Sequence, residues 1–437
     1  MLSKKNLLEL AKAKKIDNKV DRNIWTKKVA MIFGKILKRI NITYQPNTLY
    51  FGHYPETTTN VYGHKNFIND EMINYNSINF KDIVSGGFHL LMLTPEGTLY
   101  SKGNGNFGQL GHGSELKESN EPLCIEPLPK IKYISSGYAY NCVISEDGDI
   151  YSWGAGENGR LGLGDNSDIS KPTLVTSDVK FKSVACGSTF TVALSTDNEI
   201  YSWGQYCATG HIEEEDCLVP KKIKIFEGRL FHKISIGPGS YHVLALSASG
   251  KLFSWGHNRC GQLGIGSNIG EKENEEDFYV RIPFMVSKCM VGDKLMDISN
   301  YEIMDIASGW GHSMFLTNNG KVFASGRNHQ EQLGFPKECS MINGRDIKYF
   351  PYFKQVDFLA NYYIIKIFAG GEHSAALTDD YRLIFWGNVD YDNNLDEEIV
   401  EETIYPDNME GVFITKQFTN LSDVHLGNEC NCIISSN

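Results

Sequence analysis

The sequence predicts an all-β protein, a β-propeller built from seven repeats. Two recurring patterns support this fold class. A short element with an aromatic residue and a final glycine occurs seven times in the 437-residue chain and ends at Gly52, Gly103, Gly154, Gly204, Gly256, Gly326 and Gly387. A small-residue turn followed by an apolar run also occurs seven times, beginning near residues 85, 135, 185, 235, 307, 369 and 425. Short strands recurring at such a period are typical of propeller blades, which stack radially and protect their sheet edges.

Each repeat predicts two strands around a tight turn, followed by a chain reversal. In the second repeat, the apolar run 142–144 precedes Glu146-Asp147-Gly148 and the alternating segment 150–153. Hairpin turns favour residues that adopt positive φ, and the expected ones are Gly97, Gly148, Gly250, Gly320 and Asn198. Glycine-rich elements at 108–111, 159–162 and 261–264 then turn the chain where a side chain would collide with its neighbours. Four short strands are therefore expected in each repeat.

One of these elements has the glycine spacing of a dinucleotide-binding loop, at Gly154, Gly156 and Gly159. A strand-like segment precedes it, but residues 161–166 show no helical periodicity, and such a loop must open a helix. The same spacing recurs at Gly103, Gly105 and Gly108. We therefore expect these glycines to form turns of the repeat, with Gly156 in a tight turn, and we expect no cofactor.

The consensus G-G-x-H-S-x-x-L-T-x-x-G-x-V-Y-x-W-G-x-N-x-x-G-Q-L-G resembles the repeat of the regulator of chromosome condensation family over about residues 48–437. The resemblance implies a seven-bladed β-propeller. The chain begins with a lone second half at 49–52 and ends with a lone first half at 425–435, so these terminal strands are expected to pair and close the ring. The predicted domains are an N-terminal extension, 1–47, and a propeller, 48–437.

The resemblance leaves the function open, because the family includes an exchange factor for the Ran GTPase, scaffolds, ubiquitin-ligase modules and mitochondrial factors. In the Ran exchanger, acidic residues follow the glycine turn in early blades, and an inserted β-wedge reaches the GTPase. Here the early turns hold Tyr138 and Ser188, while acids occur only later, at Glu372 and Glu429. The expected function is a non-catalytic, monomeric protein-interaction scaffold or regulatory adaptor. Guanine-nucleotide exchange on a Ran-type small GTPase is the alternative.

Four histidines, His89, His242, His312 and His373, occupy equivalent places in four repeats. Equivalent positions are spread around a ring and cannot meet at one ion, so each imidazole is expected to bond to the backbone of a neighbouring blade, and no metal site is expected. No serine, cysteine or carboxylate has the spacing of a nucleophile with its base. The ten cysteines lack zinc spacing and suit reduced core positions in an intracellular protein. No apolar run reaches the length of about 18 residues needed for a transmembrane segment.

The segment through Asn47 is basic. It holds twelve Lys or Arg and three acidic residues, a net charge of +9 that leaves −20 for the remainder. Apolar residues at 25, 29, 32, 33, 36 and 40 fall on one face of a predicted amphipathic helix, with lysines opposite. The candidate docking or targeting residues are Trp25, Lys27, Lys28, Phe33, Lys35, Lys38 and Arg39.

Four roles for this helix stay open. It could pack on the propeller, act as an organelle presequence, bind nucleic acid or chromatin, or lie in a membrane interface. The compartment is not resolved between mitochondrion, nucleus and cytoplasm, although the extension slightly favours an organelle.

Acidic residues gather in the connections after the aromatic-Gly element. We expect these connections to share a rim that docks a basic protein, a small GTPase or the basic extension, although solvated loops would give the same pattern. With the two acids at glycine turns, the candidate partner-binding residues are Glu213, Glu214, Glu215, Asp216, Glu275, Glu276, Asp277, Glu372, Glu397, Glu398 and Glu429. Two repeat steps are enlarged to 70 and 61 residues, and such insertions usually carry binding specificity.

Overall fold

A computed structural model describes most of the chain from residue 80 onward. The described residues are 60–61, 73–74, 78, 80–266, 278–336, 341–342, 345–346, 349–388, 400–406, 409, 412–418, 421–426 and 431–435. They all belong to one compact unit, Thr57–Asn437. The predicted basic helix and the segment 49–52 lie outside the described residues.

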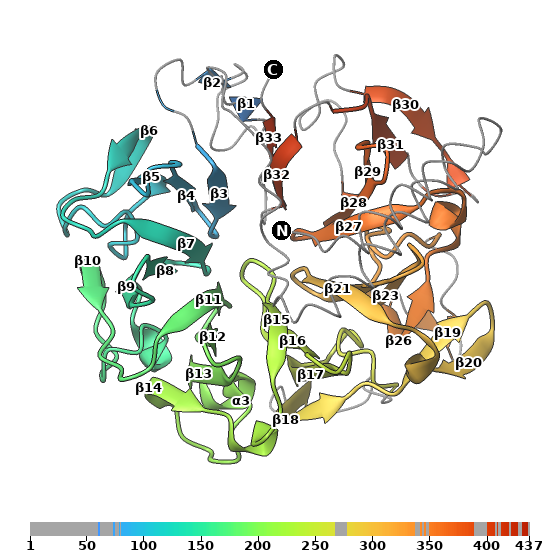
Figure 1. Ribbon diagram of the computed structural model, residues 1–437, viewed down its shortest axis with the longest axis horizontal. Helices are drawn as coiled ribbons and strands as arrows, with labels where there is room; N and C mark the ends of the chain where they lie inside the picture. The colour runs from blue at the N-terminus through green and yellow to red at the C-terminus, as the bar shows by residue number, and fades with distance from the viewer. Residues whose placement is uncertain are drawn as a thin grey trace, which may run out of the picture. The chain divides into compact units, whose positions relative to one another are not determined.

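Antiparallel sheets follow one another around a central axis (Figure 1). Blade 1 contains β3 (Asp82–Ser85), β4 (His89–Leu93), β5 (Leu99–Asn104) and β6 (Glu118–Cys124). Blade 2 contains β7 (Ile131–Ser136), β8 (Tyr140–Ser145), β9 (Ile150–Gly154) and β10 (Ile169–Leu174). Blade 3 contains β11 (Phe181–Cys186), β12 (Phe190–Ser195), β13 (Ile200–Gly204) and β14 (Cys217–Lys222). Blade 4 contains β15 (Phe231–Ser235), β16 (His242–Ser247), β17 (Leu252–His257) and β18 (Tyr279–Met285).

The last two blades are larger. Blade 5 contains β21 (Ile303–Ser308), β22 (His312–Thr317), β23 (Val322–Arg327) and β26 (Tyr349–Gln355), extended outward by β19 (Lys288–Val291) and β20 (Lys294–Asp297). Blade 6 contains β27 (Ile364–Ala369), β28 (His373–Thr378), β29 (Leu383–Gly387), β31 (Val412–Thr415) and β30 (Val400–Ile404). The enlarged step before Ala307 thus adds the β19–β20 hairpin, whose β19 pairs in parallel with β26.

Shorter elements complete the described structure. Three are two-stranded pairs, β1 (Asn60–Val61) with β2 (Ile73–Asn74), β24 (Met341–Ile342) with β25 (Arg345–Asp346), and β32 (Leu421–Leu426) with β33 (Asn431–Ser435). The described helices are α3 (Tyr206–Thr209) and four 3-10 turns, η1 (Glu157–Gly159), η2 (Lys224–Phe226), η4 (Ile298–Asn300) and η5 (Asp357–Asn361). The all-β class is confirmed, and the described helices are minimal.

The predicted number of seven blades is wrong. Within the described ranges, six sheets have four or more strands, whereas the seventh copy of the repeat forms the two-stranded hairpin β32–β33. The physical reason is that this copy is a first half, which supplies two strands, and among the described residues these strands pair only with each other. β32 nevertheless contacts both β27 and β3, so the hairpin stands between blade 6 and blade 1.

Each blade has two ends, which we name by their connections. The hairpin face carries the tight turns between the second and third strands. The predicted positive φ values are confirmed there at Gly97, Gly148, Gly250, Gly320 and Asn198, and Tyr381 adopts the same conformation in blade 6. The loop face carries the turns between the first and second strands and the connections that leave the third strand.

A packing contact between neighbouring blades explains why tryptophan and the GQLG element recur together. The indole N–H of a third-strand tryptophan donates to a carbonyl in the connection that leaves the third strand of the preceding blade, at 2.9–3.0 Å. The pairs are Trp153 with Gln109, Trp203 with Arg160, Trp255 with Ala208, and Trp386 with Gln332. All four indoles are fully buried, so their N–H groups need these partners. The repeat motif therefore encodes the contact between blades.

Candidate protein-binding face

Three exposed aromatic side chains occupy equivalent turns on the loop face. Phe88, Tyr138 and Trp310 each follow the glycine turn between the first and second strands, in blades 1, 2 and 5, and are 40%, 39% and 44% exposed. Phe107, in the glycine-rich connection of blade 1, is also exposed at this end. Large aromatic rings held in water on ordered loops are typical of protein interfaces.

The turns hold these rings outward because the preceding glycine packs against the next blade. A Cβ on Gly137 would lie 2.2 Å from Cε1 of Tyr140 and 2.5 Å from the carbonyl oxygen of Gly187. Tyr140 itself is buried and bonds to the neighbouring blade. With the backbone pressed against one blade and the following ring buried, Tyr138 is left on the surface.

Aromatic contacts divide the loop face into two sectors. In blades 1 and 2, the rings of Phe88 and Tyr138 meet edge to face, with centroids 5.4 Å apart. In blades 5 and 6, the guanidinium of Arg327 lies 5.4 Å from the Trp310 ring centroid, and its Nη1 lies 2.9 Å from Oε1 of Glu372. Glu372, one of the predicted acids, thus belongs to an ion pair beside an exposed tryptophan.

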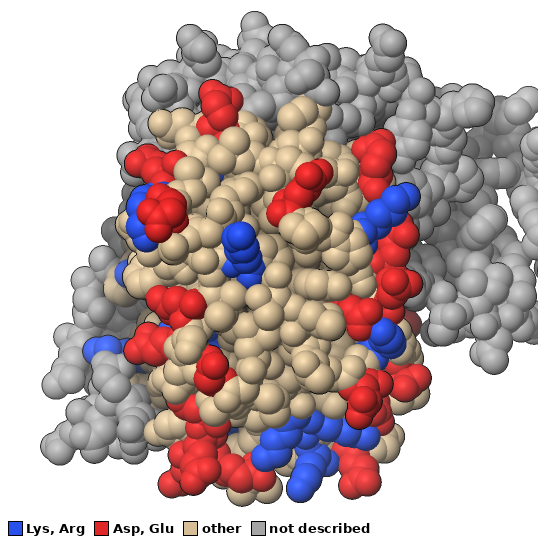
Figure 2. Space-filling model, turned by 90° about the vertical axis from the view of Figure 1, so that its left-hand side faces the viewer, with Lys and Arg blue, Asp and Glu red and all other residues tan. Residues whose placement is uncertain are grey.

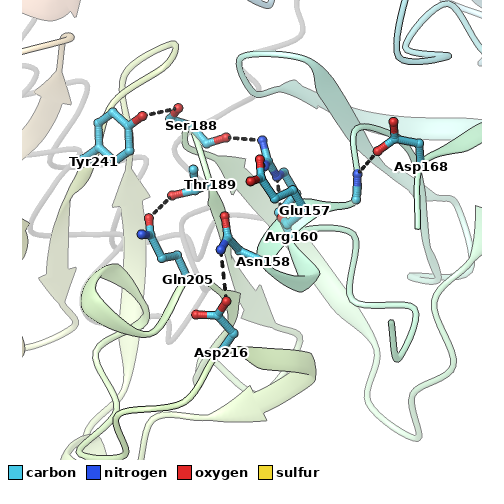
Figure 3. Close-up of polar contacts among 10 residues, drawn as sticks. Glu157, Asn158, Arg160, Asp168, Ser188, Thr189, Gln205, Asp216 and Tyr241 are labelled. Carbon is cyan, nitrogen blue, oxygen red and sulfur yellow. Dashed lines mark hydrogen bonds and ion pairs between the residues drawn. The ribbon is translucent and has the colours of Figure 1, made fainter. Parts of the chain in front are cut away.

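A polar network lies between these sectors, across blades 2, 3 and 4 (Figure 3). The buried guanidinium of Arg160 donates to the Ser188 carbonyl at 3.1 Å and pairs with the Glu157 carboxylate at 2.9 Å. Ser188 Oγ donates to the Tyr241 hydroxyl at 2.9 Å, and so connects blade 3 with blade 4. The network fixes the loop backbones, which keeps the face rigid and lowers the entropy lost on binding.

Within the acidic connection 213–216 of blade 3, most carboxylates have structural partners. Glu213 lies 2.8 Å from Lys221, and Glu214 lies 2.7 Å from Arg281 of blade 4. The hydrogen bond from Lys221 is the main reason why the pKa of Glu213 is lowered. Asp216 accepts from Asn158 at 3.0 Å (Figure 3) and from the backbone N–H of Tyr206 at 2.9 Å.

The other acidic candidates cannot be placed beside this connection. Glu215 is exposed, while Glu275, Glu276, Asp277, Glu397, Glu398 and Glu429 lie outside the described residues, as do the candidate residues of the basic extension. On the side of the molecule shown in Figure 2, acidic side chains lie mainly along the left and right edges of the described part, with basic side chains among them. The acidic docking rim stays a prediction.

Three of the four repeat histidines contact side chains of the next blade, and His242 also has the predicted kind of partner, a hydrogen bond with the backbone of His312. His89 Nε2 lies 2.7 Å from Asn141 Oδ1, His242 Nε2 lies 2.8 Å from Ser313 Oγ, and His312 Nε2 lies 2.9 Å from Ser374 Oγ. Each partner belongs to the next blade. Burial lowers the pKa of His89 to about 4 and those of His242 and His312 to about 3, so these rings are neutral at pH 7.

The glycine spacing at 154–159 serves a turn, as expected. The N–H of Gly156, which a nucleotide loop would offer to phosphate, donates to the Asp168 carboxylate at 2.9 Å. Its φ is −99°, so positive φ is not why glycine is needed. A Cβ would lie 1.9 Å from the Ser167 carbonyl oxygen, which makes close approach the reason.

Two chemical features can be stated for the described part of the chain. It contains no group of three or more His, Cys, Asp or Glu residues that could hold a metal ion. None of its helices is long and apolar enough to cross a lipid bilayer.

Sequence reasoning missed the aromatic sectors. The signal was available in the aligned turns, where SGGFH, SSGYAY and ASGWGH place an aromatic residue directly after the glycine. Isolated aromatic residues in a sequence resemble core positions, so their exposure becomes evident only in the folded chain.

This fold, with its tryptophan and glycine contacts between blades, defines a propeller built from repeats of the regulator of chromosome condensation type. The chain belongs to the RCC1-like domain family, whose family model matches residues 74–432. It is 34% identical over 263 residues to the ultraviolet-B receptor UVR8 of Arabidopsis thaliana, covering 59% of this chain and 55% of that protein. It is 29% identical over 308 residues to the mitochondrial RCC1 domain-containing protein RUG3 of the same plant, covering 70% and 53%.

Solved structures agree on the fold. Prp20p of Saccharomyces cerevisiae superposes with a TM-score of 0.68 at 19% identity, covering 88% of this chain and 92% of that one. Human WBSCR16 gives 0.65 at 16% identity, covering 88% and 100%. At these identities the likeness shows the fold alone. This chain also spans only about half of UVR8 and RUG3.

Proposed function

We propose that this protein is a non-catalytic interaction propeller, a scaffold or regulatory adaptor whose protein partner docks on the loop face. The observation that carries the proposal is the set of exposed rings at equivalent turns, Phe88, Tyr138 and Trp310. Buried aromatic and arginine side chains dominate binding energy at protein interfaces, and Trp310 has Arg327 beside it.

Related proteins support an interaction role. The study of Prp20p reports its binding to Gsp1p and to histones, and relatives of this chain include ubiquitin ligases. The acidic connections and Glu372 would add charge complementarity for a basic partner such as a histone-like protein. RUG3 is mitochondrial, which supports an organelle as one possible destination of the basic extension.

Guanine-nucleotide exchange on a Ran-type GTPase is the second candidate, favoured by the likeness to Prp20p. Tyr138 and Ser188, in place of acidic residues at the early turns, argue for binding without exchange. Purified protein at micromolar concentration should leave the rate of labelled GDP release from a Ran-type GTPase unchanged. A concentration-dependent acceleration would make exchange the function.

The docking proposal is tested by affinity capture of the full chain and quantitative mass spectrometry. Tyr138→Ala with Trp310→Ala should deplete a specific set of captured proteins at least tenfold, because each buried aromatic contributes about 2 kcal/mol or more at a hot spot. Phe284→Ala is the matched control, since this ring is also exposed but lies on the outer strand β18. Equal depletion by the control, or none by the double variant, would contradict docking on the loop face.

A further inference from the structure

A shared irregularity marks the start of the innermost strand in blades 2 to 6. In each, the pairing with the second strand shifts register between the first and third residues. A bulge of this kind redirects the extra side chain. Every first residue is buried, whereas the bulge residue is exposed or half-exposed. The bulge residues, in chain order, are Lys132, Lys182, His232, Met304 and Ile365.

These side chains lie around the axis at the hairpin face. The first residues of three inner strands, Ile131, Phe181 and Phe231, bond to the hairpin turn of the preceding blade. Because the first strands are innermost in every blade (Figure 1), their bulges lie nearest the axis. Lys81 takes the same place in blade 1, where its N–H donates to the carbonyl of Leu93 at 2.8 Å.

The surface around the axis at the hairpin face therefore has two chemically different sides. Lys81, Lys132 and Lys182 form a basic arc over blades 1 to 3, and the neutral imidazole of His232 continues it in blade 4. The equivalent residues of blades 5 and 6 are apolar, Met304 at 51% exposed and Ile365 at 41%. We name these two sides together the axial mouth.

The lysines of the axial mouth lie close enough to affect the pKa values of their neighbours. Burial lowers the pKa of Lys182, and Lys132 lowers it further. Burial likewise lowers the pKa of His232, with Lys233 and Lys182 adding to the effect. Lys182 donates only to the neutral side chain of Asn198, and among the described residues no ion pair involves Lys81, Lys132 or Lys182. Uncompensated positive charge therefore collects here, in a ring with excess negative charge.

Two nearby carboxylates are paired with lysines outside the arc. Asp305 is already bonded to Lys233, and Asp149 to Lys180. Glu96, Glu146, Asp147 and Asp197 occupy the turns between the second and third strands, which are farther from the axis. The charge pattern is thus concentric, with cations at the centre and acids around them. An extended carboxylate-bearing segment entering along the axis would meet the cations before the acids.

We propose that the axial mouth is a second binding site, which takes an acidic peptide segment of a protein partner. Its carboxylates would lie against Lys81, Lys132 and Lys182, and its apolar side chains against Met304 and Ile365. Charge complementarity selects the anion, and the apolar side distinguishes such a peptide from a nucleic acid, whose backbone offers charge alone. This site lies on the face opposite the one proposed for partner docking, so it stands independently of that proposal.

The experiment uses the full chain and a fluorescein-labelled 12-residue peptide made of Asp, Glu and Leu, followed by fluorescence anisotropy. Lys132→Glu with Lys182→Glu should weaken binding at least tenfold, and Lys132→Gln with Lys182→Gln by a smaller factor. Met304→Ser should weaken it several-fold. Lys171→Glu with Lys251→Glu is the matched control, because it changes net charge equally at exposed lysines outside the axial mouth.

Two further probes decide the chemistry. A peptide of equal charge in which serine replaces leucine should bind several-fold more weakly, and a 12-nucleotide single-stranded DNA should bind no better than that serine peptide. Retained binding in both lysine double variants with unchanged melting temperatures would overturn the proposal. So would equal loss in the control pair, or DNA binding tighter than the leucine peptide.

Discussion

The interface between blades 2 and 3 and the interface between blades 4 and 5 are built from different residues at the same repeat positions. In the first, the Tyr140 hydroxyl donates to the Phe190 carbonyl at 2.5 Å, and the Trp203 indole bonds to Arg160. In the second, His242 contacts Ser313, and Ser325 occupies the place of the tryptophan. A phenol and an indole make the contact between blades 2 and 3, whereas an imidazole makes the contact between blades 4 and 5.

The missing indole of blade 5 is replaced from another strand. A Cβ on Gly162 would lie 2.8 Å from Nε1 of Trp203, whereas a Cβ on the equivalent Gly264 would lie 2.2 Å from Cδ2 of Phe353. Phe353 belongs to the fourth strand, β26, and is fully buried. The comparison teaches that an aromatic ring is required against the glycine-rich loop, but not from a fixed sequence position.

The largest effect is expected from removing these rings. Trp203→Ala and Phe353→Ala should each lower the free energy of unfolding by about 3–5 kcal/mol, because both leave a large cavity. Ser325→Ala should cost about 1 kcal/mol or less, since its bond to the Gln262 carbonyl is 3.5 Å long. Urea unfolding measures all three. A costly Ser325→Ala beside a mild Phe353→Ala would mean that Phe353 does not replace the tryptophan.

The second largest difference between the two interfaces is expected in the dependence of unfolding free energy on pH. The folded protein holds His242 neutral, with a pKa of about 3 against 6.5 for the free side chain. Between these values the unfolded chain binds more protons, so stability is present above pH 6.5 and falls as the pH drops. The loss approaches ~1.4 kcal/mol per pH unit for each such histidine.

Urea unfolding at pH 7 and pH 5 measures this effect. His242→Gln should reduce the difference in unfolding free energy between the two conditions, whereas Tyr140→Phe, at the other interface, should leave it unchanged. If the unfolding free energy depended on pH equally in the wild type and in His242→Gln, protonation of this histidine would not destabilise the interface.

A smaller difference is expected when the hydrogen-bond partners are removed. Ser313→Ala leaves His242 Nε2 without its acceptor or donor and should cost about 1–3 kcal/mol. Thr191→Val should cost less than about 1 kcal/mol, because Tyr140 keeps the Phe190 carbonyl and Arg160 keeps the Trp203 indole. Thermal unfolding compares the two variants. A larger cost for Thr191→Val would reverse the assignment of which partner each ring needs.

The smallest effect on stability is expected where no blade interface is touched. Reversing the charges of Lys27, Lys28, Lys35 and Lys38 should leave the melting temperature nearly unchanged, because exposed ion pairs contribute at most about 1 kcal/mol each and are screened by salt. The same variant should change where a tagged protein collects in the cell. A drop of several degrees would instead identify the extension as a structural strap.

The sequence by itself determined the repeat, the strand order within a blade and the turn residues. Positive φ at Gly148 and Asn198 followed from local hairpin chemistry, and the glycine-rich loops followed from their recurrence. These features depend on neighbours close in the chain, so the local sequence of each repeat determines its strands and turns. Counting repeats did not give the number of blades, because a lone first half forms a two-stranded hairpin, β32–β33, and not a blade.

Only the tertiary structure decided which side chains meet between repeats. It placed Phe353 in the tryptophan's site, paired the buried histidines with side chains of the next blade, and left Tyr138 and Trp310 on the surface. It also placed the bulge residues Lys132 and Lys182 on the innermost strands. The physical reason is that packing between blades depends on volumes and directions contributed by distant strands, which a local periodic pattern does not contain.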